Sequence, residues 1–178
     1  AIAAIVIKRT DLAKKCKNPI YATVAGSGTN YDGKSNGITA PSGQAQVDLL
    51  TEVYRKYKIN PRDLDCVITH GTGTRLGDSI EINSLSEFLG EKQSNERLCA
   101  LTSVKPNVGH CLAASGIVSL IALVKALEKE MIPASIHCEE VNDFIQWDKS
   151  PFYVNTENKQ WKADNGKSRL GAVSAFGI

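Results

Sequence analysis

Two histidines stand where an imidazole could act on a bound substrate. His70 opens the stretch THGTGTRLGDSIE directly after an apolar run, and His110 closes the stretch SVKPNVGH ahead of several small residues. Each lies where a predicted strand gives way to a predicted helix, and strand ends of an α/β chain can converge on one site. Just before a helix, the positive end of the helix dipole favours a neutral ring at His110 and attracts negative charge. We therefore expect the two imidazoles to share a site.

The glycines after His70 raise an alternative, a loop that holds phosphate. A dinucleotide-binding fingerprint needs glycine at its first, third and sixth places, and here the sixth place after Gly71 is Leu76. A P-loop ends in Gly-Lys-Ser/Thr, which is absent, and Asp78 near the helix start would repel a phosphate. Phosphate binding is therefore not expected, and the glycines leave room for a thin substrate arm.

A lone histidine in such a turn more often serves the turn itself. The second histidine is what favours a shared site over that structural interpretation. Thr72 and Thr74 add hydroxyls beside His70 that can bond amide groups of a substrate arm.

Composition excludes several classes of function. The 178 residues suit one domain or part of a larger one, and a net charge of +2 with scattered lysines does not indicate a nucleic-acid surface. No apolar run approaches the roughly 20 residues that span a bilayer, so no membrane association is expected. The chain begins without Met and ends inside the apolar run AVSAFGI, which indicates an excerpt truncated at both ends.

The cysteines indicate a reduced, cytoplasmic protein without a metal. Five cysteines are spread along the chain with no CxxC pair. The neighbours His110-Cys111 and His137-Cys138 lie 27 residues apart, an offset that matches no usual zinc-ligand spacing.

Alternating strands and helices predict an α/β fold without internal repeats. The predicted strands cover residues 1–8, 20–28, 65–70, 98–104, 152–155 and 170–176. The Gly, Asn, Asp and Pro residues of 30–43 predict a long loop, a candidate for function.

Three helices follow from apolar residues at helical spacing. The first begins after Ser42 and presents Val47, Leu50, Tyr54 and Tyr57. The second is expected to begin at Asp78, with Glu81 completing a capping box, to bury Ile82, Leu85 and Leu89, and to end at Gly90. The third follows residue 116 and presents Ile117, Leu120, Ile121, Val124 and Leu127.

Four motifs together resemble the β-ketoacyl synthase family, most closely the ketosynthase domains of modular polyketide synthases. They are HGTGTRLGD, SVKPNVGH, NYDGKSNGITAP and the closing SAFGI. The resemblance spans essentially the whole chain, 1–178, and leaves no second domain. It implies the C-terminal half of a duplicated, thiolase-like fold with α-β-α-β-α layers.

The resemblance implies a decarboxylative Claisen condensation, as in polyketide and fatty acid biosynthesis. A cysteine that lies upstream in the family carries an acyl chain, and a malonyl unit on an acyl carrier protein loses carbon dioxide. The positions that match His70 and His110 stabilise the enolate, and Lys105 organises the pocket. The fragment alone is expected to be inactive.

The resemblance also implies where the substrate arm lies. Thr72, Thr74, Thr39 and Asn107 match positions that contact phosphopantetheine, and the backbone of Ile178 matches part of the oxyanion hole. No cofactor is expected to belong to this chain, because the phosphopantetheine arm is carried by the acyl carrier protein. The expected partners are that protein and the N-terminal half of the same domain, with a homodimer when the domain is complete.

The sequence departs from the family pattern at three places. Leu112 stands where the family usually has an acidic residue that supports the lysine. Ile68-Thr69 and Asp78-Ser79 replace Glu-Ala and Asp-Pro, as packing or capping variation.

None of the five cysteines lies in the small-residue elbow expected of the nucleophile, and all are assigned to packing. Only Cys111, beside His110, keeps an alternative as a reactive thiol. Two other functions stay open: a non-elongating relative that passes acyl chains on or gates them, and an unrelated α/β domain that binds a small molecule. Non-elongating relatives commonly lose one of the two histidines, and both are present here.

Overall fold

The computed structural model describes residues 1–35, 37, 40–91, 98–163 and 166–177. Its centre is a four-stranded sheet in the order β4-β2-β1-β6. The strands are β1 (Cys66–Ile68), β2 (Cys99–Thr102), β4 (Phe152–Val154) and β6 (Gly171–Val173). All neighbours run parallel, with Cys66 opposite both Ala100 and Gly171. The carboxyl ends of β6, β1 and β2 therefore meet at one edge.

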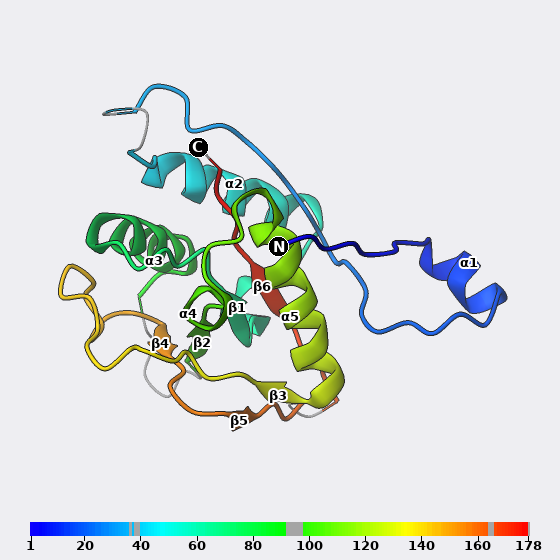
Figure 1. Ribbon diagram of the computed structural model, residues 1–178. Helices are drawn as coiled ribbons and strands as arrows, with labels where there is room; N and C mark the ends of the chain where they lie inside the picture. The colour runs from blue at the N-terminus through cyan, green and yellow to red at the C-terminus, as the bar shows by residue number, and fades with distance from the viewer. Residues whose placement is uncertain (36, 38–39, 92–97, 164–165, 178) are drawn as a thin grey trace.

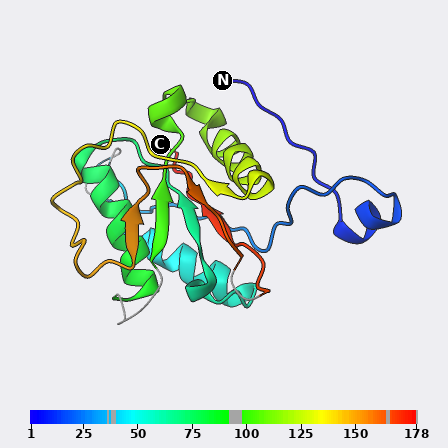
Figure 2. The same cartoon turned by 90° about the horizontal axis from the view of Figure 1, so that it is seen from below.

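Helices cover both faces of this sheet. α5 (Ser115–Lys129) lies on one face, and α2 (Gly43–Lys56) and α3 (Arg75–Leu89) lie on the other (Figures 1 and 2). Successive side chains of β1 point to opposite faces of the sheet. Ile68 packs in the cluster with Leu123 of α5, and Val67 packs in the cluster with Ile82 of α3. Burial on both faces explains the continuous apolar runs of the central strands.

Shorter elements complete the described chain. They are α1 (Thr10–Lys15), η1 (Pro61–Asp63), α4 (Lys105–Val108), η2 (Leu112–Ala114), β3 (Met131–Ile132) and β5 (Lys159–Gln160). β3 and β5 pair antiparallel in a separate two-stranded sheet. No helix among the described residues has the length and apolar character that crossing a membrane requires.

The strands predicted at residues 1–8 and 20–28 are wrong for this chain. Neither segment is a strand, and α1 occupies part of the connection between them. Ile2, Val6 and Ile7 are largely exposed, and the segment with α1 extends away from the body of the molecule (Figure 1). A strand requires hydrogen bonds from a neighbouring strand, and the described strands pair only among themselves.

The helix after Ser42 is confirmed, because the Ser42 side chain accepts from the backbone N–H of Ala45 at 3.2 Å. The predicted start of α3 is wrong. Thr74 is its N-cap, accepting from the N–H of Gly77, and Asp78 lies one turn inside the helix. The predicted burial of Ile82, Leu85 and Leu89 and the end at Gly90 are confirmed.

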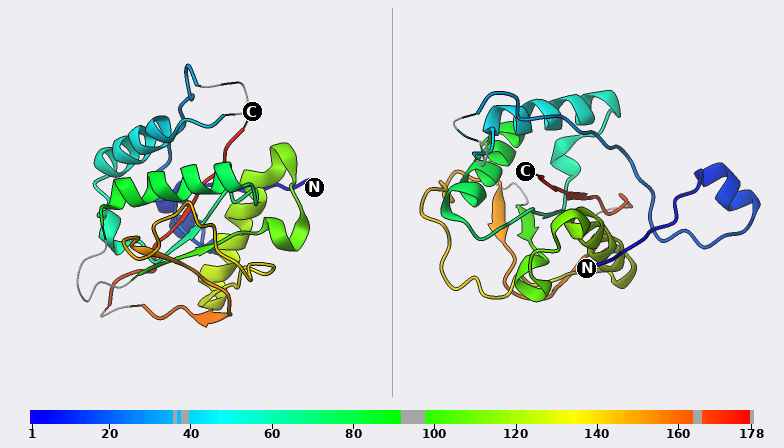
Figure 3. Two further views of the ribbon diagram at one scale, coloured as in Figure 1. Left: turned by 90° about the vertical axis from the view of Figure 1, so that its left-hand side faces the viewer. Right: turned by 45° about the horizontal axis from the view of Figure 1, so that its top comes forward.

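α5 presents a different face to the sheet from the predicted one. Its buried residues are Ser115, Ser119, Leu123 and Ala126. The large apolar side chains predicted for this face are only half-buried: Ile117, Leu120, Ile121, Val124 and Leu127. The close contact with β6 is made by Leu123, and it requires glycine on the strand, because a Cβ on Gly171 would come within 2.5 Å of Leu123. Figure 3 shows α5 beside β6 in its right-hand view.

Candidate active site

Three neighbouring strands deliver residues to one place. His70 follows β1, Lys105 follows β2 as the first residue of α4, and Phe176 follows β6. His110 reaches the same place from the segment between α4 and η2. The ring centroids of His70 and His110 are 5.4 Å apart and their planes meet at 79°. The predicted convergence of the two imidazoles is confirmed.

The surroundings of His70 determine which ring nitrogen carries its proton. Its Nδ1 lies 3.3 Å from the backbone nitrogen of Phe176 and 3.3 Å from Nζ of Lys105. A backbone N–H only donates, so Nδ1 must accept and the proton of the neutral ring lies on Nε2. His70 therefore carries its donor on the nitrogen away from Phe176.

His110 has the same arrangement from different partners. The backbone N–H of Leu112 donates to His110 Nδ1 at 3.0 Å, and Oγ of Ser115 lies 3.5 Å from the same atom. The turn at Cys111, with φ of −81° and ψ of 14°, directs the N–H of Leu112 back towards the ring of residue 110. Here too the neutral ring carries its proton on Nε2.

Burial and charge keep His70 neutral. The residue is 8% exposed, and burial, then the positive charge of Lys105, then His110, lower the pKa of His70 from 6.5 to about 4. Both effects disfavour the imidazolium form. At neutral pH the ring is a hydrogen-bond donor through Nε2 rather than a proton-bearing cation.

Lys105 contacts His70 and lies within the electrostatic influence of two acids of α3. Its Nζ donates to the carbonyl oxygen of His70 as well as approaching the ring. Burial lowers the pKa of Lys105, and this effect is opposed by the charge of Glu81 and less strongly by that of Asp78. Leu112, which stands where the family usually has an acid, is 76% exposed. The acids whose charge acts on Lys105 are Glu81 and Asp78 of α3.

Glu81 is the site residue that sequence reasoning missed. Its two carboxylate oxygens accept the backbone N–H groups of His70 at 2.8 Å and Gly71 at 3.0 Å. The side chain is 3% exposed, and burial raises the pKa of Glu81 to about 7 against the lowering effect of those two hydrogen bonds. The predicted capping box of Asp78 and Glu81 is therefore wrong, because Glu81 accepts N–H groups of the loop before the helix. The signal in the sequence was an acid four residues before Leu85, on the helix face predicted to be buried.

The loop that carries Thr72 and Thr74 also contacts α3. Oγ1 of Thr72 and Oγ1 of Thr74 lie 3.1 Å apart, and Asp78 accepts the N–H of Gly73 at 3.1 Å. Both threonine side chains are exposed. Gly71 is required here, since its φ is +46° and a Cβ would come within 2.8 Å of Thr69 Oγ1 and 2.9 Å of Ser103 Oγ.

Asn107, another predicted site residue, forms no hydrogen bond with this cluster among the described residues. Asn107 lies in α4 with an exposed side chain, and its backbone N–H bonds Val104. Thr39 and Ile178 lie outside the described residues. The predicted roles of these three residues stay predictions.

The cysteines differ in their surroundings. Cys66 and Cys99 are buried, and burial raises the pKa of Cys66 to about 12. Burial also raises the pKa of Cys138. Cys111 is half-buried and its thiol donates to the Gly109 carbonyl at 3.7 Å. Among the residues that the structure describes, no three His, Cys, Asp or Glu side chains gather as metal ligands would.

Two imidazoles that meet beside the strand ends of an α/β layer are the arrangement expected of a condensing enzyme, and the similarity to known proteins agrees with it. Residues 21–139 match the family described as beta-ketoacyl synthase, C-terminal domain, and the chain belongs to this family. The chain superposes on the ketosynthase from module 6 of the bacillaene synthase of Bacillus subtilis with a TM-score of 0.92 and 40% identity, over 96% of this chain and 30% of that one. The thiolase-like α/β fold is therefore confirmed.

Sequence relatives are polyketide synthases. The chain is 48% identical over 178 residues to polyketide synthase ThaG of Burkholderia thailandensis, covering 100% of this chain and 3% of that protein. It is 41% identical to polyketide synthase PksM of Bacillus subtilis, covering 100% of this chain and 4% of that protein. The chain thus corresponds to the C-terminal part of a ketosynthase domain and spans a small share of these relatives.

Proposed function

We propose that this chain supplies the decarboxylation site of a β-ketoacyl synthase that extends a polyketide by Claisen condensation. In the proposed reaction, the bond between the malonyl carboxylate and its Cα breaks, carbon dioxide leaves, and the electron pair forms an enolate. The enolate carbon attacks an acyl thioester on a cysteine, whose thiolate leaves. Negative charge develops at the malonyl thioester oxygen before the new bond forms.

The observation that carries the proposal is the matched state of the two imidazoles. Both Nδ1 atoms accept a backbone N–H, from Phe176 at His70 and from Leu112 at His110, so both neutral rings carry a proton on Nε2. Two such donors with ring centroids 5.4 Å apart can approach one oxygen from two directions. A donor aimed at developing negative charge typically contributes about 3 kcal/mol to lowering a barrier.

The remaining residues have supporting roles in this proposal. Lys105 donates to the His70 carbonyl oxygen, and its charge adds to burial in lowering the pKa of the His70 ring. Thr72 and Thr74, with Thr39 and Asn107, contact the phosphopantetheine arm, and the backbone N–H of Ile178 contributes to the oxyanion hole of the acyl thioester. The chain needs no metal or cofactor of its own in this scheme.

The proposal requires partners that bring the other reactants. These are an acyl carrier protein that carries the malonyl unit and the N-terminal half of the ketosynthase that carries the cysteine. The complete domain is proposed to be a cytoplasmic homodimer. A non-elongating role is disfavoured because both histidines are present and both carry their donors on Nε2.

The test uses the complete ketosynthase with His70→Ala, His110→Ala and, as a matched control, His137→Asn. His137 is an exposed histidine with a φ of 56°, a conformation that Asn tolerates. Release of carbon dioxide from malonyl-carrier protein should fall about 100-fold or more in the first two variants. The control should retain wild-type rates, and all three should still acylate the cysteine. Wild-type decarboxylation by either active-site variant would refute the proposal.

A further inference from the structure

Arg75, the first residue of α3, forms an ion pair with Asp143, which lies in a loop far away in the sequence. Arg75 Nε lies 3.2 Å from Oδ1 of Asp143, and its terminal nitrogen lies 2.7 Å from Oδ1 and 2.6 Å from Oδ2. The guanidinium also lies 4.3 Å from the ring centroid of Phe144. The two charged residues are 68 positions apart. Because the carboxylate meets two nitrogens of the planar guanidinium, the contact fixes the orientation of the Arg75 side chain as well as its distance from Asp143.

Two hydrogen bonds reinforce this contact. Nδ2 of Asn142 donates to the carbonyl oxygen of Arg75 at 2.8 Å, and Nδ2 of Asn83 donates to the carbonyl oxygen of Phe144 at 3.3 Å. The loop therefore holds the backbone of α3 at its first residue and a side chain two turns later. We call Asn142, Asp143 and Phe144 the clasp.

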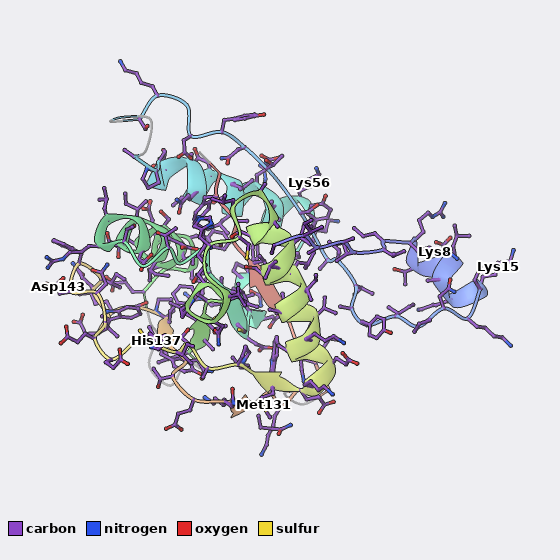
Figure 4. All side chains as sticks on the ribbon, in the orientation of Figure 1. Lys8, Lys15, Lys56, Met131, His137 and Asp143 are labelled. Atoms are coloured by element: carbon purple, nitrogen blue, oxygen red, sulfur yellow. The ribbon has the colours of Figure 1, made fainter. Side chains whose placement is uncertain are left out.

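The clasp is itself anchored to the body of the protein. Ile145, directly after it, is 6% exposed and belongs to the core cluster beneath α3. Nε1 of Trp147 donates to the carbonyl oxygen of Asn142 at 2.9 Å, and the Trp147 ring packs against the same cluster. Figure 4 shows Asp143 on the loop beside α3. A contact anchored in this way can restrain α3 rather than move with it.

Arg75, which the clasp holds, is directly connected to the loop that carries Thr72 and Thr74. Arg75 directly follows Thr74, the N-cap of α3, and Thr74 Oγ1 lies 3.1 Å from Thr72 Oγ1. From inside the fold, Asp78 and Glu81 of the same helix hold the backbone of residues 70, 71 and 73. The start of α3 is thus held from the core by its acids and from outside by the clasp.

We propose that the clasp positions the Thr72 and Thr74 hydroxyls for the amide groups of the carrier's pantetheine arm, with Asp143 and Asn142 acting as positioning residues through Arg75. The inference rests on the proposed function, because it assigns the threonines to the arm. It predicts an effect on arm binding and little effect on the chemical step, which depends on His70 and His110.

The test measures decarboxylation by the complete ketosynthase with two small substrates. Malonyl-pantetheine carries the amide groups of the arm, and malonyl ethyl thioester lacks them. Asp143→Lys turns the attraction to Arg75 into repulsion, and Arg75→Glu with Asp143→Lys restores opposite charges. Asn142→Ala removes only side-chain hydrogen bonds.

The matched control is Asp11→Lys, which reverses a second exposed Arg–Asp pair, Arg9 with Asp11 in α1. Figure 4 shows Lys8 and Lys15 of that region on the opposite side of the view from Asp143.

Asp143→Lys should raise KM for malonyl-pantetheine and change kcat less than about twofold. The rise should be only about fivefold, because exposed ion pairs contribute little free energy. Asn142→Ala should raise KM in the same direction, and the charge-swapped pair should return it to near the wild-type value. Asp11→Lys should match the wild type, and no variant should change KM for the ethyl thioester. Salt should raise KM for malonyl-pantetheine in the wild type more than in Asp143→Lys, because it screens the pair.

An unchanged KM for malonyl-pantetheine in both Asp143→Lys and Asn142→Ala would overturn the clasp. So would an equal rise with the ethyl thioester, or a fall in kcat without a change in KM. These outcomes leave the proposed function standing as long as the wild type decarboxylates both substrates. Normal decarboxylation after His70→Ala would instead refute the function itself.

Discussion

The backbone N–H of Phe176 donates to Nδ1 of His70 at 3.3 Å across a separation of 106 residues. The contact exists because β6 pairs in parallel with β1, which brings the residues after both strands to the same edge of the sheet. The consequence is chemical, because the contact assigns the imidazole proton to Nε2. A main-chain donor performs this task, so any residue at position 176 other than proline can provide it.

Glu81→Gln should disturb the loop that carries His70. A glutamine offers one acceptor oxygen, whereas Glu81 accepts the N–H groups of both His70 and Gly71. One buried N–H is left without an acceptor, which costs about 1–3 kcal/mol of unfolding free energy. The decarboxylation rate should fall with it. Glu87→Gln, an exposed change on the same helix, is the control. Denaturant unfolding and carbon dioxide release check both, and equal stability of the two variants would contradict the prediction.

The pH dependence of stability should differ between variants of His70 and Glu81. The folded-state pKa of His70 is lowered from 6.5 to about 4, so its contribution to stability is complete above pH 6.5 and is lost as pH falls towards 4. The folded-state pKa of Glu81 is raised from 4.5 to about 7, so its contribution decreases as pH rises from 4.5 to 7. The two slopes oppose each other in the wild type.

Removing one group should therefore reveal the slope of the other. Relative to the wild type, Glu81→Gln should lose stability more steeply on acidification from pH 6.5, and His70→Gln should lose it more steeply between pH 4.5 and 7 as pH rises. Each slope is at most about 1.4 kcal/mol per pH unit. Urea unfolding across pH 4.5–7.5 measures them, and parallel curves for all three proteins would count against the assignment.

Lys105→Met should raise the pKa of His70. The charge of Lys105 is the second cause of the low value, after burial, so the pKa should rise only part of the way to 6.5. Lys125→Met, which changes an exposed lysine of α5, should leave the pKa unchanged. Nuclear magnetic resonance titration of the His70 ring protons measures it. A His70 pKa that stays near its wild-type value in Lys105→Met would show that the charge of Lys105 does not reach the ring.

Gly71→Ala should destabilise the protein more than Gly73→Ala. Both glycines have positive φ, +46° and +76°, so alanine is strained at each by roughly 1–2 kcal/mol. Only at position 71 does a new Cβ also meet atoms of Thr69 and Ser103 within 3.0 Å, whereas position 73 is open. Thermal unfolding compares the two. Equal losses would indicate that the neighbours of Gly71 shift at no cost.

Local patterns in the sequence were sufficient for the positions of His70 and His110, whereas Lys105 was indicated only by the resemblance to β-ketoacyl synthases. Each histidine lies beside a strand or helix whose apolar spacing is encoded within about ten neighbouring residues, and parallel strand ends bring such positions together. The same reasoning identified β1, β2 and the body of α3. The sequence determined the ends of the helices less well, because several nearby side chains can serve as the cap. The N-cap of α3, for example, is Thr74 and not Asp78.

Contacts between distant residues decided the rest. The sequence contains Glu81, Phe176 and Leu112 but does not indicate that they bond to the loop or to the histidine rings, because those bonds form only after the strands have paired and the chain has turned. The buried face of α5 also depends on distant contacts, since Leu123 packs against Gly171 of β6, which the apolar spacing within α5 does not indicate. Apolar spacing is a local property, whereas the state of an ionisable group depends on whatever the fold packs around it.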